Sequence, residues 1–490
     1  MSIYKNLFKT TLIYGIATVV PKMIGFIMAP YHIDWLPKNA YADYTLIFSW
    51  LMFFNVVLSF GMETAFFRFY NKQENKKEVV NNTLWFLMAV CAVFLGLVYL
   101  FKNAIDAYFG IPPIVVSFLI FILVLDTLAV IPFAILRAQQ RPIKYSIIKI
   151  VNVVINASLT VLFLYAIPTY LQKHPSTSGI SDYFVPNFQV GYLFIANLVA
   201  SICTLLLLST YYAQLKAKFN KLLWKEMVLY SFPVMIGGLA FVVNETFDKV
   251  FLDILLPEDF KKLGLASYGA IYKIGVFMVL FRMAYSLGIE PFFFSYAKND
   301  DAPIKYATIT KYFVIFGSFA MLTIVVFADL IKSFYIPQKD YWFAMEIVPY
   351  IILANLLLGI YTNLSVWYKL QDKTKIGAYI SVLGAVVTLA LNFILIPKIG
   401  LIGSAITTLI AYAVMMLISF VLGQKAYPIP YDKKAIGMYL GVSTLFSFGY
   451  FYNFRENYFI GITLILIFVG IIYYNEKAFL QRLLKSIIKK

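Results

Sequence analysis

Apolar residues along the chain gather in fourteen runs, which are separated by short polar segments that hold most of the charged residues. Each run is close to the roughly 20 residues that an α-helix needs to cross the hydrocarbon core of a bilayer. The pattern therefore predicts fourteen membrane helices, at residues 9–30, 44–67, 82–102, 114–136, 146–168, 188–212, 227–254, 266–294, 311–335, 344–368, 376–396, 402–423, 435–452 and 458–474. The first run is too long for the apolar region of a secretion signal, so we expect it to remain as a helix.

Composition agrees with this pattern. Hydrophobic residues make up 61% of the chain and charged residues 13%, whereas about a quarter of a soluble domain is charged. Cys91 and Cys203 both lie inside apolar runs, so they predict neither a disulfide framework nor a zinc site. His32 and His174 fall in predicted loops and cannot build a metal or catalytic site alone. We expect an all-α polytopic membrane protein without a bound metal or organic cofactor.

The basic residues are unevenly distributed between the predicted loops. With the N-terminus placed in the cytoplasm and residues near the helix ends counted with the adjoining loop, 28 of the 41 Lys and Arg fall in cytoplasmic segments, 9 in outer loops and 4 well inside predicted helices. Short cytoplasmic loops are the ones that carry excess positive charge. Both termini are therefore predicted to be cytoplasmic. Topology and anionic lipid headgroups account for the net charge of +17, so we expect no nucleic acid as a partner.

Two enzyme classes are disfavoured by what the loops contain. The longest outer loop, at about 171–187, is too short for the folded domain that a membrane-embedded glycan polymerase or ligase needs to carry its catalytic groups. A G-x-x-x-x-G-K-[ST] phosphate loop is absent from the sequence, so direct ATP hydrolysis is unsupported. We expect a protein that is not an enzyme.

Parts of the first half of the chain recur in the second half. The pattern Ser-x-Gly-x-Glu occurs at 59–63 and again at 286–290, an offset of 227 that also relates Lys22 to Lys249. Six predicted helices separate the copies, so both copies would enter the membrane from the same side. Such parallel repeats, related by an axis along the membrane normal, are one of the designs of transporters.

The repeat predicts the domain organisation. Helices 1–6 would form an N-terminal lobe at 1–215, and helices 7–12 a C-terminal lobe at 216–424. These two parallel six-helix lobes would surround a central cavity. Helices 13 and 14, with a basic cytoplasmic tail, lie outside the repeat at 425–490.

Ionisable side chains inside the predicted helices are the candidates for function. Each costs roughly 2.5–3.5 kcal/mol at the middle of a bilayer. We therefore expect most of them to face a wet cavity, to pair with one another or to lie near the headgroups. We single out nine of them as candidates: Lys22, Glu63, Asp126, Glu245, Asp248, Lys249, Lys273, Arg282 and Glu290.

The cations among them suggest a site for an anion. Lys22 and Lys249 each precede by eight residues a proline that closes the helix, which places them about 12 Å from the helix end. A lysine in a cavity wall suits a phosphate. The alternatives are that Lys22 extends to the outer headgroups and that Lys249 forms a structural ion pair. Lys273 is the third candidate for the cavity, whereas Arg282, half a rotation away, is expected at an interhelical or interfacial contact.

The acids suggest ion coupling or gating. Asp126 has no cation within one helical turn, so it could bind a coupling proton or sodium ion, or hydrogen-bond a neighbouring helix. Glu63, with Arg68 nearby, and Glu290 lie near the cytoplasmic ends and suggest duplicated gate-closing contacts. Glu245 precedes Lys249 by one turn, which favours a local partner for that lysine. The candidates for ion coupling or gating are Asp126, Glu63, Glu245, Asp248 and Glu290.

Five short motifs resemble those of polysaccharide flippases and occur in the same order. They spread over most of the chain, and each is weak alone. The chain is thereby similar to the multidrug/oligosaccharidyl-lipid/polysaccharide exporter superfamily (MOP superfamily), specifically to its O-antigen, Wzx-type branch. The motifs lie at Lys9–Gly15, Gly61–Phe69, Pro132–Pro142, Asp248–Lys249 and Leu395–Ala405.

The resemblance implies a function and a mechanism. Such a protein would move an undecaprenyl-pyrophosphate-linked oligosaccharide from the inner to the outer leaflet of the bacterial inner membrane by alternating access, for surface polysaccharides such as the O-antigen of lipopolysaccharide. It implies that Lys22 and Lys249 receive the pyrophosphate, and that a proton or sodium gradient or the membrane potential supplies the energy. The implied partners are the lipid-linked oligosaccharide, membrane lipids, a polysaccharide polymerase and glycosyltransferases.

Two alternatives within the same superfamily stay open. A multidrug or organic-cation exporter would need an acidic cavity, which Lys22 disfavours. Relatives that flip the peptidoglycan precursor, lipid II, often carry arginine where Lys22 and Lys249 stand, and arginine binds phosphate bidentately whereas lysine acts as a point charge. In those relatives the last two helices form a groove for the lipid tail.

Overall fold

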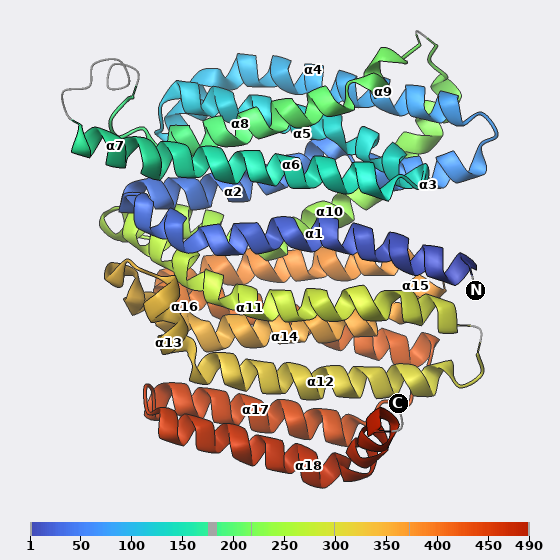
Figure 1. The fold of residues 1–490 in the computed structure, drawn as a ribbon, viewed down its shortest axis with the longest axis vertical. Helices are drawn as coiled ribbons and strands as arrows, with labels where there is room; N and C mark the ends of the chain where they lie inside the picture. Colours follow the sequence, from blue (N-terminus) through green and yellow to red (C-terminus); the bar gives the residue numbers. More distant parts are fainter. Residues whose placement is uncertain (1, 175–183, 217, 298, 372, 489–490) are drawn as a thin grey trace. The chain divides into compact units, whose positions relative to one another are not determined.

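A computed structural model of the chain describes residues 2–174, 184–216, 218–297, 299–371 and 373–488. Every regular element in these ranges is helical (Figure 1). The helices belong to two compact units, of which the first comprises Met1–Asp253 and Glu258–Ala266, and the second Ile254–Pro257 and Ser267–Lys490. The prediction of an all-α polytopic membrane protein is confirmed.

The first unit is built on helix α5. This helix packs against α8, α4 and α2, while α6 packs against α1 and α8 (Figure 1). Its elements are α1 (Ser2–Trp35), α2 (Lys38–Ser59), α3 (Met62–Lys72), α4 (Lys76–Phe109), α5 (Pro113–Ala138), α6 (Pro142–Val161), the π-helical turn η1 (Leu162–Ala166), α7 (Ile167–Lys173), α8 (Gln189–Leu208), α9 (Thr210–Ala213) and most of α10 (Lys221–Leu255).

The second unit is built on α12 and α14. Helix α14 packs against α16 and α12, and α12 also packs against α17 and α18. Its elements are most of α11 (Glu258–Tyr296), α12 (Ala302–Val326), α13 (Ala328–Tyr335), the 3₁₀ helix η2 (Lys339–Ile347), α14 (Val348–Leu364), α15 (Val366–Leu370), α16 (Thr374–Ala426), α17 (Lys433–Asn453) and α18 (Tyr458–Ile488).

All fourteen predicted stretches lie in helices. In the described part of the chain, eleven helices are long and apolar enough to cross a membrane, one of them the 53-residue α16. That helix contains both the eleventh and the twelfth predicted spans, which are separated by a kink at Ile399 and at Gly400, whose φ is 58°. The lobe boundaries follow the repeat rather than the packing and stay predictions, as does the cytoplasmic location of the termini.

The two copies of the Ser-x-Gly-x-Glu pattern have different backbones. In the first copy α2 ends at Ser59, and Phe60 and Gly61 both have φ values in the left-handed region, 53° and 63°. Backbone from α10 lies close at this point, because a Cβ on Gly61 would be 2.7 Å from the carbonyl oxygen of Ser231. In the second copy α11 continues through 286–290 without interruption.

Helix α5 contains an internal proline whose effect is compensated. Pro132 has no backbone N–H, so the carbonyl of Leu128 lacks its usual helical donor. The hydroxyl of Tyr212 donates to this carbonyl at 2.6 Å. The helix therefore keeps a proline within its span without leaving the carbonyl unsatisfied.

Helices α17 and α18 are fastened to α12 and α13 by charges near both ends. At one end Arg455 donates two hydrogen bonds of 2.7 Å to the carboxylate of Asp329. At the other end the ammonium of Lys311 lies 2.8 Å and 2.9 Å from the two carboxylate oxygens of Glu476. These two ion pairs hold α17 and α18, the helices outside the repeat, against α12 and α13 of the second unit.

Candidate functional site

The first unit contains a row of charged side chains that begins with Asp126 in α5. The Ser201 hydroxyl, from α8, donates to one oxygen of this carboxylate at 2.7 Å. Asp126 lies about midway along its 26-residue helix, so it is near the middle of the span. The structure thus shows the hydrogen bond to a neighbouring helix that was one of the two expectations for this residue.

Lys149 in α6 is the cation beside Asp126. It interacts electrostatically with both Asp126 and Glu63, and its ammonium lies 4.3 Å from the centre of the Phe133 ring. Pro142 starts α6 at its first turn, so Lys149 is two turns inside the helix and about 10 Å from its end. Asn152, one turn further, donates to Thr204 of α8 at 2.9 Å.

Glu63 and Arg137 form the exposed end of the row. Their side chains meet at 2.6 Å and are 43% and 45% exposed. Glu63 lies in the first turn of α3, where the helix dipole favours a negative charge. The predicted neighbour Arg68 instead lies over the Tyr230 ring, 4.3 Å from its centre.

The row therefore consists of two acids and two bases, Glu63, Arg137, Lys149 and Asp126. It carries no net charge when all four are ionised, which lowers the cost of placing these groups inside a membrane. Arg137 and Asp126 are separated by about three turns of α5, or about 16 Å. A proton or sodium ion bound at Asp126 would leave the row with an uncompensated positive charge, so the row is electrostatically sensitive to ion binding. We refer to these four residues and Ser201 as the charge row.

The predicted anion site has an ion pair at its second lysine. The ammonium of Lys249 lies 2.8 Å and 2.9 Å from the two carboxylate oxygens of Asp248, whose side chain is 1% exposed. Glu245, one turn earlier on α10, is half-buried. Lys22 is exposed on α1, directly after Pro21. Lys249 therefore has a partner on its own helix, the adjacent Asp248.

The remaining predicted residues lie in the second unit. Lys273 is half-buried in α11. The stem of Arg282 passes beside α14, where a Cβ on Gly359 would lie 3.6 Å from its Cδ, so this arginine makes the expected interhelical contact. Glu290 falls within α11, but its side chain lies outside the described residues.

Potential metal ligands are not clustered in the part of the chain that the structure describes. No group of three or more His, Cys, Asp or Glu could hold a metal ion there. Cys91 and Cys203 are free thiols. His174 stacks on Tyr170 at a ring distance of 4.6 Å, while residues 175–183 of the predicted outer loop lie outside the described residues.

Three members of the charge row, Arg137, Lys149 and Ser201, were not among the sequence candidates, and Lys149 is the one closest to the centre of the row. Its position near the start of an apolar run placed it among the cytoplasmic residues. The available signal was Pro142, because proline is preferred at the first turn of a helix and marks an earlier start. A helix starting there carries Lys149 into the membrane opposite Asp126.

Two family models match the chain. Residues 7–296 match the family described as polysaccharide biosynthesis protein, and residues 233–394 match MatE. An uncharacterized membrane protein of Methanocaldococcus jannaschii is 21% identical over 426 residues, which cover 80% of this chain and 79% of the relative.

Solved structures show the same fold. The lipid II flippase MurJ in an inward closed conformation aligns with a TM-score of 0.73 at 17% identity, over 95% of this chain and 99% of that chain. A point mutant of the Vibrio cholerae MATE transporter VcmN aligns with a TM-score of 0.61 at 15% identity, over 87% and 97% of the two chains. A transporter from Pyrococcus furiosus, described as having a binding pocket of reversed polarity, aligns with a TM-score of 0.57 at 12% identity, over 86% and 95%.

Proposed function

Because the chain belongs to the polysaccharide biosynthesis protein family of the MOP exporter superfamily, we propose that it is a flippase for an undecaprenyl-pyrophosphate-linked oligosaccharide. This superfamily consists of transporters rather than enzymes. The flippase would act in the inner membrane of a bacterium and move its substrate from the inner to the outer leaflet by alternating access. The glycan would serve a surface polysaccharide such as an O-antigen.

The family match, which extends over residues 7–296, is the observation that carries this proposal. The chemistry of the cations supports it. In this proposal Lys22 and Lys249 bind the pyrophosphate, and Lys273 is a third cation for the same group. Asp248 holds the Lys249 ammonium at 2.8 Å, so an entering pyrophosphate would compete with this carboxylate for the lysine.

The charge row is proposed to couple transport to an ion gradient. Asp126 would bind a proton or a sodium ion. The resulting change in the charge of Asp126 would act electrostatically on Lys149 and, through Lys149, on the Glu63–Arg137 pair. Glu63 and Glu290 would close the cytoplasmic side, and Glu245 and Asp248 would set the charge beside Lys249. Energy then comes from the gradient or membrane potential, without a bound cofactor. A polymerase and glycosyltransferases are the proposed protein partners.

A reconstituted flipping assay tests the function. Vesicles containing the purified protein receive a fluorescent undecaprenyl-pyrophosphate-linked oligosaccharide, and a membrane-impermeant reagent reports its exposure in each leaflet. We expect flipping by the wild type and a loss of roughly tenfold or more in K22A and K249A, because each removes a cation from the pyrophosphate. K225A is the control, since Lys225 is an exposed lysine of α10 without a proposed role. Full activity of the K22A/K249A double variant would remove both lysines from the mechanism.

The MatE match at residues 233–394 favours one second candidate, an exporter of organic cations. The same vesicles distinguish it. Uptake or efflux of a fluorescent organic cation, with no flipping of the lipid-linked glycan, would replace the proposed function. Lipid II is added as a third substrate, and its preferential flipping would assign the peptidoglycan-precursor role instead.

A further inference from the structure

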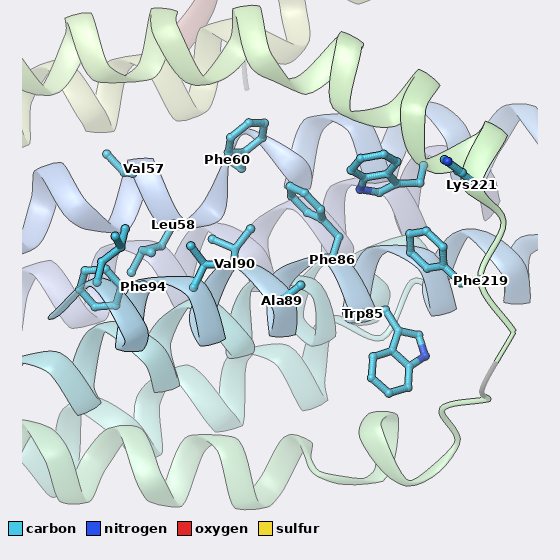
Figure 2. Close-up of a pocket in the computed structure, with 13 residues that line it drawn as sticks. Val57, Leu58, Phe60, Trp85, Phe86, Ala89, Val90, Phe94, Phe219 and Lys221 are labelled. Carbon is cyan, nitrogen blue, oxygen red and sulfur yellow. The ribbon is translucent and has the colours of Figure 1, made fainter. Parts of the chain in front are cut away.

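An apolar groove of about 600 Å³ opens in the first unit between α2, α4 and the start of α10. Figure 2 shows Phe60 and Phe86 near its centre, with Phe94 towards one end and Phe219 and Lys221 at the other. Lys221 is the single charged residue in the lining. We refer to this feature as the α2–α4–α10 groove. Its lining comprises Val57, Leu58, Phe60, Trp85, Phe86, Ala89, Val90, Val93, Phe94, Leu97, Phe219, Lys221 and Trp224.

The groove faces outward along a membrane helix. Trp85, Val93 and Leu97 of α4 are 37%, 63% and 49% exposed although all three are apolar, as expected for positions that contact lipid chains. Trp85 and Leu97 are separated by about three helical turns, or about 18 Å along the helix. This length exceeds half of the roughly 30 Å hydrocarbon core, so the groove runs from near one headgroup layer towards the other.

Hydrogen bonds fix the Lys221 end of the groove. The side chain of Asn82 in α4 accepts from the backbone N–H of Asn220 at 3.0 Å and donates to its carbonyl at 2.7 Å. Asn81 does the same with the segment before it, donating to the carbonyl of Lys218 and accepting from the N–H of Lys216 at 2.8 Å. Asn81 and Asn82 are 8% and 1% exposed. The segment that carries Phe219 and Lys221 is therefore held against α4, so this end of the groove has a defined structure.

Aromatic rings line the groove continuously. Phe60 meets Phe86 edge to face with ring centres 5.4 Å apart, Phe86 lies 6.4 Å from Trp224, and Trp224 lies 6.1 Å from Phe219. Rings of this kind offer both faces and edges to a partner. A methyl-branched, unsaturated isoprenoid chain presents methyl groups and double bonds to them, whereas a saturated acyl chain presents methylenes alone.

The positive charge at one end of the groove favours a ligand with an anionic head group. Lys221 lies at one end of the groove, in a segment that also contains Lys216 and Lys218 and that the positive-inside pattern places at the cytoplasmic surface. A ligand with a long apolar chain and an anionic phosphate head matches both ends of the groove at once. Basic clusters at a membrane surface attract such heads.

We propose that the α2–α4–α10 groove binds the polyprenyl chain of the lipid-linked substrate from the inner leaflet, with its phosphate end at Lys221. This inference rests on the proposed function, which supplies a polyprenyl pyrophosphate as the cargo. It places the tail in the first unit rather than on the last two helices, α17 and α18. The groove binds the isoprenoid tail while the pyrophosphate and the glycan enter the transport path. The tail therefore stays on the lipid-facing surface of the protein throughout transport.

Filling the groove tests the inference. Ala89 is exposed in the middle of the lining, so A89W places an indole where the chain would lie. Ala92 is the matched control, because it is an exposed alanine of the same helix outside the lining. We expect A89W to lower the flipping rate of the lipid-linked oligosaccharide roughly tenfold and A92W to leave it unchanged. At the head end K221Q is compared with K225Q, and only K221Q should raise the substrate concentration needed for half-maximal rate.

Photolabelling tests the occupant directly. A polyprenyl diphosphate with a diazirine in its chain is irradiated with the protein in vesicles, and labelled peptides are located by mass spectrometry. The inference expects labels on α2 and α4 that unlabelled polyprenyl diphosphate removes and phosphatidylglycerol does not. Equal labelling by a diazirine phosphatidylglycerol, without competition, would show ordinary lipid contact and overturn it, as would labels confined to α17 and α18.

The two proposals fail in different ways. If the wild type flips the lipid-linked oligosaccharide but A89W is fully active and the groove is unlabelled, the groove inference is wrong and the proposed function stands. If the groove is labelled competitively while the wild type flips no lipid-linked glycan, the site stands and the proposed function is wrong.

Discussion

At Asp126 a carboxylate near the middle of a membrane span has both a hydroxyl donor and a cation around it. Ser201 donates to it at 2.7 Å, and Lys149 supplies the opposite charge. The ionisation state of Asp126 determines the net charge of the whole row. Structural support and ion coupling therefore predict different behaviour when the charge alone is removed.

Replacement of Asp126 by asparagine separates these roles. D126N keeps a carbonyl acceptor for Ser201 but removes the charge, so a purely structural residue should tolerate it. If Asp126 couples transport, we expect D126N to lose roughly tenfold or more of the gradient-driven flipping rate and to become insensitive to an imposed proton or sodium gradient. S201A is the control that removes the hydrogen bond and keeps the charge. Gradient-dependent flipping by D126N would contradict the coupling role.

Asp329 is in the first turn of α13, beyond the apolar span Ala302–Val326 with which the structure replaces the predicted helix 311–335, and it forms a network with Arg455 and Lys332. Burial opposes ionisation of its carboxylate, but hydrogen bonds and charges from Arg455 and Lys332 outweigh burial and hold the pKa of Asp329 below its ordinary value. A carboxylate with a lowered folded-state pKa stabilises the protein above its unfolded pKa, near 4, and this stability is lost as the pH falls through the folded-state value.

The Asp329 network predicts a pH-dependent difference in stability. Because D329N leaves two cations without their carboxylate at a site only 6% exposed, we expect it to cost about 2–4 kcal/mol near neutral pH. Thermal unfolding in detergent, measured from pH 7 downwards, should show wild type and D329N converging below about pH 4, as the wild-type carboxylate protonates. A constant difference across this range would assign the effect to packing rather than to charge.

Among the elements, the interruption between α2 and α3 shows how a neighbouring helix selects a backbone. Gly61 adopts a φ of 63° and lies against the backbone of α10, near Ser231 and Met235. Any Cβ at this position meets both a left-handed conformation and a steric clash. The interruption also aims α3 so that Glu63 reaches Arg137 on α5.

Gly61 and Gly110 have similar φ values, and comparing them distinguishes the cost of a left-handed backbone from the cost of a steric clash. Gly110 ends α4 with a φ of 61°, but a Cβ there would have nothing within 4 Å. We expect G110A to cost about 1–2 kcal/mol from the left-handed backbone alone. G61A should cost roughly 1–3 kcal/mol more, because α10 must also move. Thermal unfolding of both variants in detergent measures the difference, and equal losses would show that contact with α10 is unimportant.

For the whole molecule, the distribution of basic residues predicts the orientation in the membrane. The segment before α17 contains Asp432, and the turn after it contains Glu456, which is 66% exposed. The predicted span at 435–452 separates them, so we expect them to face opposite sides. The positive-inside pattern assigns Asp432 to the cytoplasm and Glu456 to the outer side.

Cysteine labelling tests this orientation. In a background without Cys91 and Cys203, an impermeant maleimide should label E456C in intact cells and D432C after permeabilisation alone. The expected difference in labelling is close to all-or-none, because the bilayer excludes the reagent. The opposite pattern would place both termini outside and exchange the two ends of the α2–α4–α10 groove.

The amino-acid sequence by itself determined the spans, because each apolar run partitions into a bilayer through its own local composition. It also placed Lys249 and Asp126 in helices that are apolar enough to cross a membrane, since a charge in an apolar run is visible without knowing its neighbours. The partner of Asp126 was decided by the tertiary structure. Lys149 lies on another helix, and only the packing of α5, α6 and α8 brings the two together. The same holds for the repeated Ser-x-Gly-x-Glu pattern, whose first copy is broken and whose second is helical. One sequence pattern allows both backbones, and the close approach of α10 selects between them.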